Sequence, residues 1–293
     1  MNIEVFVNWN GTVNSFTPKF MNFSAGEVHL SSPINIKKPE NITEIFILSD
    51  IKSSEDVMRT LIVTNAIKHS VEQHSIKISL IVPYLPYSRS DRVCAKGEEF
   101  GLELFAQLIH TQGYKSVITF DAHSSVAKGL ISNLKEVKLE WLVSHYLRTN
   151  SLKYDILLSP DKGAEEKGLL CSKETGIPVT QGFKVRDPNT GKLSGFGLVN
   201  GDLLTDKKVL MIDDLCDFGG TFLGLLKEVE VFKPQQVDLL VTHGIFGKGV
   251  EVLEEGGFHS VDAINYFSED LESSDNTLND FIFDIVRGDF SYE

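Results

Sequence analysis

The stretch VLMIDDLCDFGGTF (Val209–Phe222) indicates the fold of this chain. Its apolar start predicts a buried strand, the pair Asp213-Asp214 follows, and a glycine loop leads into a helix that opens at Thr221. In open α/β sheets, ligands bind beyond the carboxyl ends of the strands. Backbone N–H groups at a helix start suit a phosphate, whereas carboxylates suit sugar hydroxyls or Mg²⁺. The stretch therefore predicts a site for a phosphorylated ribose.

Apolar runs and amphipathic stretches alternate on both sides of this segment. Buried strands are predicted at Ile45–Leu48, Ile78–Val82, Ser116–Phe120, Ile156–Leu158, Val209–Ile212 and Val237–Val241. Helices are predicted from Ser53 or Ser54 and over Gly101–Thr111, Gly163–Lys173 and Thr221–Val231. The alternation predicts an α/β protein with mainly parallel sheets flanked by helices. The stretch Gly176–Gly201 is rich in Gly, Pro, Asn, Asp and Lys, and is interpreted as a long excursion or flap.

The length of 293 residues suits two α/β domains. We expect them to cover residues 1–145 and 146–293, joined near Trp141–Asn150. The last section is acidic and polar from Ser268 to Ser274 before an apolar helical pattern resumes.

The net charge of −13 disfavours binding to nucleic acid, because no basic run exceeds Lys37-Lys38 or Lys207-Lys208. The three cysteines are widely spaced and indicate reduced thiols. The first residues lack the pattern of a signal peptide, and no apolar run is long enough to cross a bilayer. We therefore expect a cytoplasmic protein with no membrane partner.

Several segments carry a family resemblance. Val209–Phe222 resembles the phosphoribosyl pyrophosphate (PRPP) binding loop of type I phosphoribosyltransferases and of ribose-phosphate diphosphokinases, the PRPP synthetases. Further segments resemble the synthetases in the same order along the chain. These are FSAGEVHL (Phe23–Leu30), PYLPYSRSDRV (Pro83–Val93), VITFDAHSS (Val117–Ser125), LLSPDKGAEEKG (Leu157–Gly168), GFKVRDPNTGK (Gly182–Lys192) and VTHGIFGKG (Val241–Gly249).

The resemblance implies two similar phosphoribosyltransferase-like domains and a role for each matching residue. The implied ribose-phosphate site is Asp213, Asp214, Asp217, Phe218, Gly219, Gly220 and Thr221. The implied pyrophosphate loop is Asp161, Lys162 and Gly163, and the implied catalytic residues are Lys184, Arg186 and His123. The implied ATP site is Phe23, Glu27, Arg89, Asp91 and Arg92. The implied cofactor is Mg²⁺, near His123 and Asp161.

Physical chemistry agrees with these assignments. Arg89 and Arg92 offer planar forks for phosphate or for stacking on a base. A flap that carries Lys184 and Arg186 brings two cations to phosphates and excludes water. Val185 stands between them where the synthetases usually have a third cation.

Three departures from the family pattern concern the substrates. Ala25 and Ser90 replace expected polar residues of the ATP site, and the acidic C-terminal section does not follow the usual family ending. Phe218 occupies a position usually held by Thr or Gly beside the 5′-phosphate. Its ring would either narrow the pocket or stack on a larger substituent carried by that phosphate, as in ADP-ribose.

These observations predict an ATP-dependent diphosphokinase that converts ribose 5-phosphate to PRPP and AMP. The first alternative is the same chemistry on a 5-substituted ribose such as ADP-ribose. The second is a phosphoribosyltransferase that consumes PRPP, and the third is an inactive regulatory subunit that binds nucleotides. The expected partners are ATP and a phosphorylated ribose. The resemblance also implies a homo-oligomer, a dimer or a hexamer.

Overall fold

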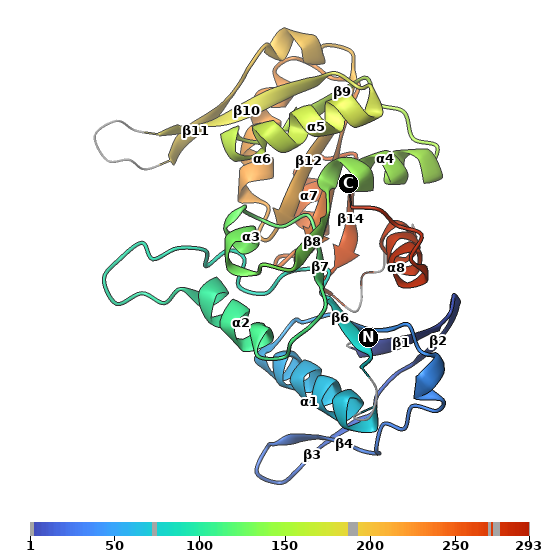
Figure 1. Cartoon of the computed structure of the whole chain (residues 1–293). Helices are drawn as coiled ribbons and strands as arrows, with labels where there is room; N and C mark the ends of the chain where they lie inside the picture. Colours follow the sequence, from blue (N-terminus) through green and yellow to red (C-terminus); the bar gives the residue numbers. More distant parts are fainter. Residues whose placement is uncertain (1–2, 72–74, 187–192, 269–270, 272–275, 293) are drawn as a thin grey trace. The chain divides into compact units, whose positions relative to one another are not determined.

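The chain folds into two compact units (Figure 1). Unit 1 contains Met1–Val137 and Asn279–Glu293, and unit 2 contains Lys138–Leu278. The computed structural model describes residues 3–71, 75–186, 193–268, 271 and 276–292, so most of the acidic stretch after Ser268 lies outside it. Each unit has a six-stranded sheet, mostly parallel, and helices, which confirms the predicted α/β class. Within these ranges, no helix has the length and apolar character required to span a bilayer.

The sheet of unit 1 has the strand order β2-β1-β5-β6-β7-β8. Its parallel part is β5 (Glu44–Ser49), β6 (Lys77–Ile81), β7 (Val117–Phe120) and β8 (Leu134–Val137). The first three confirm the predicted strands. The antiparallel pair β1 (Ile3–Trp9) and β2 (Thr12–Phe16) extends this sheet beyond β5 and was not predicted. The side chains of β2 are exposed or half-buried, which explains why it lacks an apolar signature.

The other elements of unit 1 include three helices that follow strands of the parallel part. They are α1 (Ser54–Ser70), α2 (Gly101–His110) and α3 (Val126–Leu130), together with the short helix η1 (Pro39–Asn41) and the hairpin β3 (Phe20–Asn22) with β4 (Val28–Leu30). Val63 and Ile67 of α1, with Leu102 and Phe105 of α2, join one core with the buried side chains of the sheet. The apolar residues whose spacing predicted these helices form the helix faces that pack in this core.

The last helix, α8 (Thr277–Arg287), returns to unit 1. The Phe283 ring meets Phe6 of β1 edge-on at 6.3 Å, and Asn8 donates its side-chain N–H to the Val286 carbonyl at 2.9 Å. The division therefore differs from the predicted boundary between residues 145 and 146. Helix α4 (Leu139–Thr149) lies wholly in unit 2, and the C-terminal residues complete unit 1 because the apolar stripe of α8 is buried there.

The sheet of unit 2 has the strand order β11-β10-β9-β12-β13-β14, parallel except for β11. The strands are β9 (Ile156–Ser159), β10 (Val179–Arg186), β11 (Leu193–Leu198), β12 (Lys208–Cys216), β13 (Gln236–Gly244) and β14 (Ser260–Tyr266). The helices are α4, α5 (Glu165–Thr175), α6 (Gly220–Glu230) and α7 (Glu251–Glu255), with the short helices η2 (Lys162–Ala164) and η3 (Gly201–Leu204). The strand predicted at Val209–Ile212 continues to Cys216 because β13 extends equally far and pairs with it.

The predicted excursion Gly176–Gly201 is largely a β-ribbon. Strands β10 and β11 pair antiparallel, and β10 also joins the parallel sheet through β9. Residues 187–192, which connect the two strands, lie outside the described part of the chain. The glycine content of the segment hid its strand character, because glycine disfavours a strand unless a neighbour packs closely.

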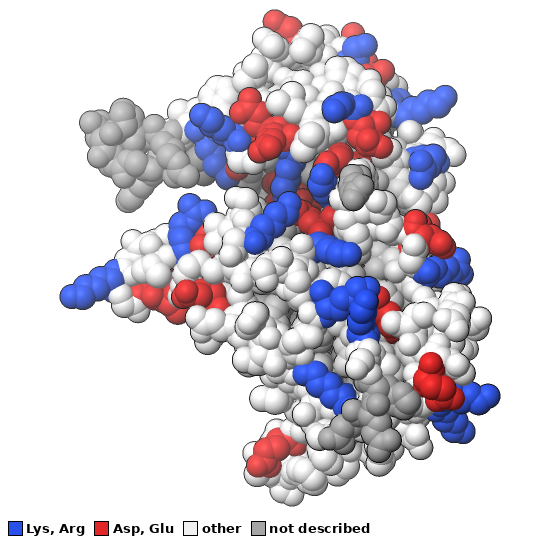
Figure 2. All heavy atoms as spheres, in the orientation of Figure 1, with Lys and Arg blue, Asp and Glu red and all other residues white. Residues whose placement is uncertain are grey.

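Charges of both signs are spread over the surface. Figure 2 shows Lys and Arg side chains interspersed with Asp and Glu side chains on the face that it draws. This mixture agrees with the low content of basic runs in the sequence and with an overall excess of acidic residues, 41 against 28. Positive charge for an anionic ligand must therefore come from individual side chains.

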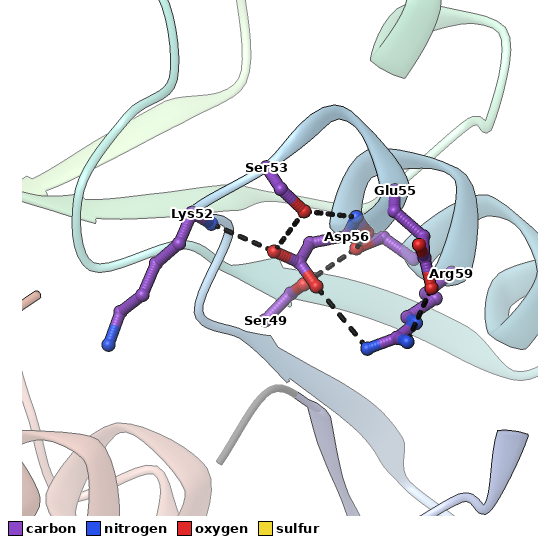
Figure 3. Close-up of polar contacts among 7 residues, drawn as sticks. Ser49, Lys52, Ser53, Glu55, Asp56 and Arg59 are labelled. Atoms are coloured by element: carbon purple, nitrogen blue, oxygen red, sulfur yellow. Dashed lines mark hydrogen bonds and ion pairs between the residues drawn. The ribbon is translucent and has the colours of Figure 1, made fainter. Parts of the chain in front are cut away.

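At the start of α1, side chains of the same segment accept hydrogen bonds from backbone N–H groups (Figure 3). The Ser53 hydroxyl accepts the Asp56 N–H at 3.2 Å and donates to the Asp56 carboxylate at 2.7 Å. The same carboxylate accepts the Lys52 N–H at 3.2 Å and lies 3.6 Å from the Arg59 guanidinium. Of the two serines expected to start this helix, Ser53 is the N-cap, and Asp56 supports it.

Replacing Ser53 with alanine should lower the free energy of unfolding by about 1 kcal/mol, because the Asp56 N–H loses its acceptor. Urea unfolding of the variant would measure the change. The matched control is Ser54→Ala, since Ser54 is the first residue of the helix and alanine favours that position. Equal stability of the two variants would contradict the capping role of Ser53.

Candidate active site

The predicted ribose-phosphate loop joins β12 to α6. Within the last part of β12, Asp213 is half-buried and Asp214 is buried, and the Asp213 carboxylate accepts the Asp214 N–H at 2.9 Å. Gly219 is the N-cap of α6 with φ of +74°, a left-handed conformation that favours glycine. A Cβ atom there would also come within 2.6 Å of the Leu253 side chain. The loop therefore needs glycine at this position both for its backbone and for its packing.

The electrostatic potential at the start of this loop is negative. Burial, together with the charges of Asp213 and Asp217, raises the pKa of the Cys216 thiol to about 12. The thiol consequently stays neutral at physiological pH. Phe218 follows Asp217 and is 58% exposed, so its ring faces solvent at the rim of the loop.

The predicted pyrophosphate loop follows the neighbouring strand β9. Because β12 pairs with β9 in parallel, with Met211 opposite Leu158, the two loops leave the same edge of the sheet from adjacent strands. Asp161 caps η2 and accepts the N–H groups of Gly163 at 2.8 Å and Ala164 at 3.3 Å. In this structure both N–H groups of the predicted pyrophosphate loop therefore donate to Asp161.

Asp161 also forms an ion pair with Lys184 of β10, with Nζ and Oδ2 2.8 Å apart. Burial acts to raise the pKa of Asp161, but the hydrogen bond and charge of Lys184 and the N–H groups of Gly163 and Ala164 outweigh it. The pKa therefore lies below its usual value. The pair joins the pyrophosphate loop to the predicted catalytic flap, so two of the predicted site residues are in direct contact.

Replacing Lys184 with methionine should raise the pKa of Asp161, because the burial remains while its cation is removed. A carboxyl NMR titration would measure this, with Lys173→Met of α5 as the control. The folded pKa of the wild type is depressed, so this carboxylate stabilises the fold above its unfolded pKa of about 3.9, and the contribution disappears as pH falls through the folded value. An unchanged Asp161 pKa in the variant would contradict the ion pair.

Gly182 is a residue of the site that sequence reasoning did not assign. A Cβ atom there would lie 2.8 Å from the Pro160 carbonyl oxygen and 2.6 Å from the Leu225 side chain. Glycine thus lets β10 approach the loop after β9, which brings Lys184 within reach of Asp161. The sequence feature that could have identified Gly182 is a glycine inside a stretch that also contains apolar residues. Arg186 ends β10, and its side chain lies outside the described part of the structure.

The predicted ATP segment of unit 1 follows β6 and centres on Asp91. Its buried carboxylate forms two hydrogen bonds with the Arg92 guanidinium, at 2.7 and 3.0 Å, while Arg92 remains 70% exposed. Arg92 lowers the pKa of Asp91 most strongly, and the nearby charge of His123 lowers it further. Asp91 therefore brings together the segments after β6 and β7. Arg89 is exposed.

Two further observations concern the residues around Asp91. Ser90, a departure from the expected pattern, accepts the Gly101 N–H on its hydroxyl and the Leu102 N–H on its carbonyl, both at 3.1 Å, and so holds the start of α2. His123 is exposed after β7. The preceding Asp121 is buried with φ of +45°, and its N–H donates to the Val137 carbonyl at 2.8 Å. This turn directs the segment away from the sheet at the strand end.

The hairpin between β3 and β4 carries the remaining predicted ATP residues. Glu27 is exposed, and the half-exposed Phe23 ring stacks on His29, with centroids 5.2 Å apart and planes at 26°. The turn is closed by hydrogen bonds from the Phe23 N–H to the Glu27 carbonyl and from the Gly26 N–H to the Phe23 carbonyl. An aromatic face is thus available on an exposed turn.

Several known proteins resemble this chain in sequence. Residues 11–113 match the family described as the N-terminal domain of ribose phosphate pyrophosphokinase. The ribose-phosphate pyrophosphokinase of Mycoplasmopsis pulmonis is 24% identical over 240 residues, which cover 80% of this chain and 71% of that protein. The enzyme of the same name from Ureaplasma parvum is 30% identical over 197 residues, 66% of this chain and 58% of its own length. The chain is therefore similar to ribose-phosphate pyrophosphokinases over most of its length.

The similarity to ribose-phosphate pyrophosphokinases makes the chain an enzyme of the transferase class. A solved structure agrees on the fold over almost the whole chain. The phosphoribosylpyrophosphate synthetase of Mycobacterium smegmatis superposes with a TM-score of 0.72 at 20% sequence identity, and the match covers 93% of this chain and 91% of that one. The predicted fold family is therefore confirmed.

Proposed function

We propose that this protein transfers the β,γ-pyrophosphate of ATP to the anomeric hydroxyl of ribose 5-phosphate and releases AMP and PRPP. The observation that carries the proposal is the pair of adjacent loops in unit 2. The Asp161 loop with Lys184 and the Asp213–Thr221 loop leave neighbouring parallel strands, so a diphosphate and a sugar phosphate would be bound side by side. Relatives named ribose-phosphate pyrophosphokinase support the same reaction.

In the proposed reaction the anomeric oxygen attacks the β-phosphorus of ATP. A bond forms between these atoms, the bond from the β-phosphorus to the oxygen that bridges it to the α-phosphorus breaks, and AMP leaves with that oxygen. The hydroxyl proton passes to solvent. Lys184, with Arg186 beside it on the flap, would neutralise the charge that develops on the transferred phosphates. Asp213 and Asp214 would hold the ribose hydroxyls, and Gly219, Gly220 and Thr221 would offer backbone N–H groups to the 5′-phosphate.

The ATP site is proposed at the residues of unit 1. Arg89 and Arg92 are exposed cations, and Asp91 fixes the Arg92 guanidinium through two hydrogen bonds. A fixed planar cation suits phosphate oxygens or the face of a base. Phe23 would stack on the adenine, and Glu27 would accompany it from the same hairpin. We propose that the hairpin acts on a neighbouring subunit, so the enzyme would be a homo-oligomer.

Mg²⁺ is the proposed cofactor, near His123 and Asp161. Over the described ranges of the chain, no group of three or more His, Cys, Asp or Glu side chains is arranged to hold a metal ion. This fits Mg²⁺, which uses one or two carboxylates and takes its other oxygens from water and substrate phosphates. When bound, the ion would neutralise the phosphates of ATP.

The product masses test the proposal. Purified protein is incubated with Mg-ATP and either ribose 5-phosphate, ADP-ribose or no acceptor, and the mixtures are analysed by mass spectrometry. We expect AMP and PRPP with ribose 5-phosphate. AMP formation only with ADP-ribose would shift the function to the 5-substituted acceptor. Consumption of added PRPP without ATP would favour a phosphoribosyltransferase, and absence of all these products would support a regulatory subunit.

A further inference from the structure

The predicted ribose-phosphate loop contains no basic side chain. Val209–Phe222 includes three carboxylates, of Asp213, Asp214 and Asp217, and the first basic residue of α6 is Lys227 in its last turn. A phosphate dianion bound at the start of α6 would therefore meet a negative field, with only backbone N–H groups to offset it. Binding of a sugar phosphate calls for a cation from another element.

The segment after β13 approaches this loop. Strand β13 lies beside β12, with Cys216 opposite Gly244, so their following segments leave the sheet together. The Gly247 N–H donates to the Asp217 carbonyl at 3.0 Å. A Cβ atom on Gly247 would lie 3.0 Å from the Phe218 ring and 3.3 Å from the Asp217 carboxylate, which is tight for any side chain. Glycine at this position allows the two segments to pack.

This packing brings Lys248 to the rim of the loop. Its ammonium nitrogen lies 5.7 Å from the centroid of the Phe218 ring, within the range of a cation–π interaction. Both side chains are exposed, so the ammonium group is available to a ligand. The exposed ring of Phe218 thereby has a partner within the protein. The ring holds the ammonium charge of Lys248 beside the start of α6, where the phosphate is proposed to bind.

We propose that Lys248, held by the Phe218 ring, binds the 5′-phosphate of the acceptor sugar. The proposal rests on the proposed function of the same loop and adds to it a cation that the loop lacks. Lysine suits this task because its ammonium group is a compact charge with three donors. Phe218 acts as a positioning residue, since it reaches the phosphate through Lys248.

Direct binding tests the proposal without catalysis. Isothermal titration of the full chain with ribose 5-phosphate is compared for the wild type, Lys248→Met and the control Lys227→Met. We expect Lys248→Met to weaken ribose 5-phosphate binding by about 10- to 100-fold, the loss typical of one charged hydrogen bond. Lys227→Met and the affinity for ATP should stay within about twofold of the wild type, because neither involves this contact.

The role of Phe218 is tested with Phe218→Leu, Phe218→Tyr and the double variant Phe218→Leu/Lys248→Met. If the ring acts through Lys248, Phe218→Leu weakens ribose 5-phosphate binding less than Lys248→Met does. Phe218→Tyr, which keeps an aromatic ring, binds as the wild type does. The double variant binds as Lys248→Met does. Independent losses that add in the double variant would overturn the positioning role. Such additivity, together with tighter binding of ADP-ribose than of ribose 5-phosphate, would assign the ring to a larger substituent instead.

Failure of this inference is distinguishable from failure of the proposed function. If Lys248→Met binds ribose 5-phosphate as the wild type does while the wild type forms AMP and PRPP, Lys248 has no phosphate role and the reaction stands. If the wild type forms no AMP but Lys248→Met binds ribose 5-phosphate more weakly, the binding role stands and the reaction does not. Absence of ribose 5-phosphate binding to the wild type overturns both.

Discussion

Replacement of Lys184 by methionine is expected to slow AMP formation about 100- to 1,000-fold with little change in the affinity for either substrate. Removal of one group that stabilises charge in a transition state typically has an effect of this size. The ammonium group of Lys184 lies 2.8 Å from Asp161 at the loop proposed to bind the diphosphate. Methionine keeps most of the side-chain volume and removes the charge. Steady-state rates with Mg-ATP and ribose 5-phosphate would measure the loss.

The control for this experiment is Lys173→Met in the last turn of α5, which removes a lysine from the same unit away from the proposed site. It should keep the wild-type rate. Thermal unfolding of both variants would show that the Lys184 variant is folded. A rate within threefold of the wild type would contradict a catalytic role for Lys184.

Replacement of Gly219 by alanine should have the second large effect, on both stability and acceptor binding. The left-handed backbone at Gly219 alone costs about 1–2 kcal/mol for a residue with a Cβ atom. Overpacking against Leu253 adds about 1–3 kcal/mol, since the new Cβ would lie 2.6 Å from that side chain. Displacement of the loop would also move the N–H groups at the start of α6, so ribose 5-phosphate binding should be lost.

The adjacent glycine provides a matched control. Gly220 is the first residue of α6, and a Cβ atom there meets nothing within 4 Å. Gly220→Ala should leave the urea unfolding of the protein unchanged or make it slightly more stable, because alanine favours a helix. Equal effects of the two substitutions on stability would contradict a specific requirement for glycine at position 219.

Sequence patterns predicted most of the parallel strands, because buried strands are continuous apolar runs, but β8 and β14 were not predicted. Strands β5, β6, β9 and β13 follow this rule closely. This apolar pattern did not reveal the pair β1 with β2 or the pair β10 with β11. The side chains of β2 are largely exposed, and β11 is rich in glycine. The place of α8 was also missed, because the burial of an apolar stripe does not reveal which sheet covers it.

The sequence suggested candidate site residues where a polar segment follows a predicted strand. Asp161, Asp213 and His123 were proposed in this way, and the order of the motifs indicated the family. The contacts between segments were not predictable. Lys184 reaches Asp161 because Gly182 permits the approach of β10, and Lys248 reaches Phe218 because β12 and β13 end together. Such contacts depend on strand register, which the spacing of residues within one segment does not contain.

The return of α8 to the first unit affects the order in which the newly made chain can fold. Unit 2 is one continuous stretch, so its core can form without residues from elsewhere in the chain. Unit 1 must wait for residues after 278, and until then Phe6 and its neighbours lack the cover that α8 gives them. The N-terminal sheet, although made first, is therefore expected to mature last, and during that interval its uncovered face is a target for chaperones.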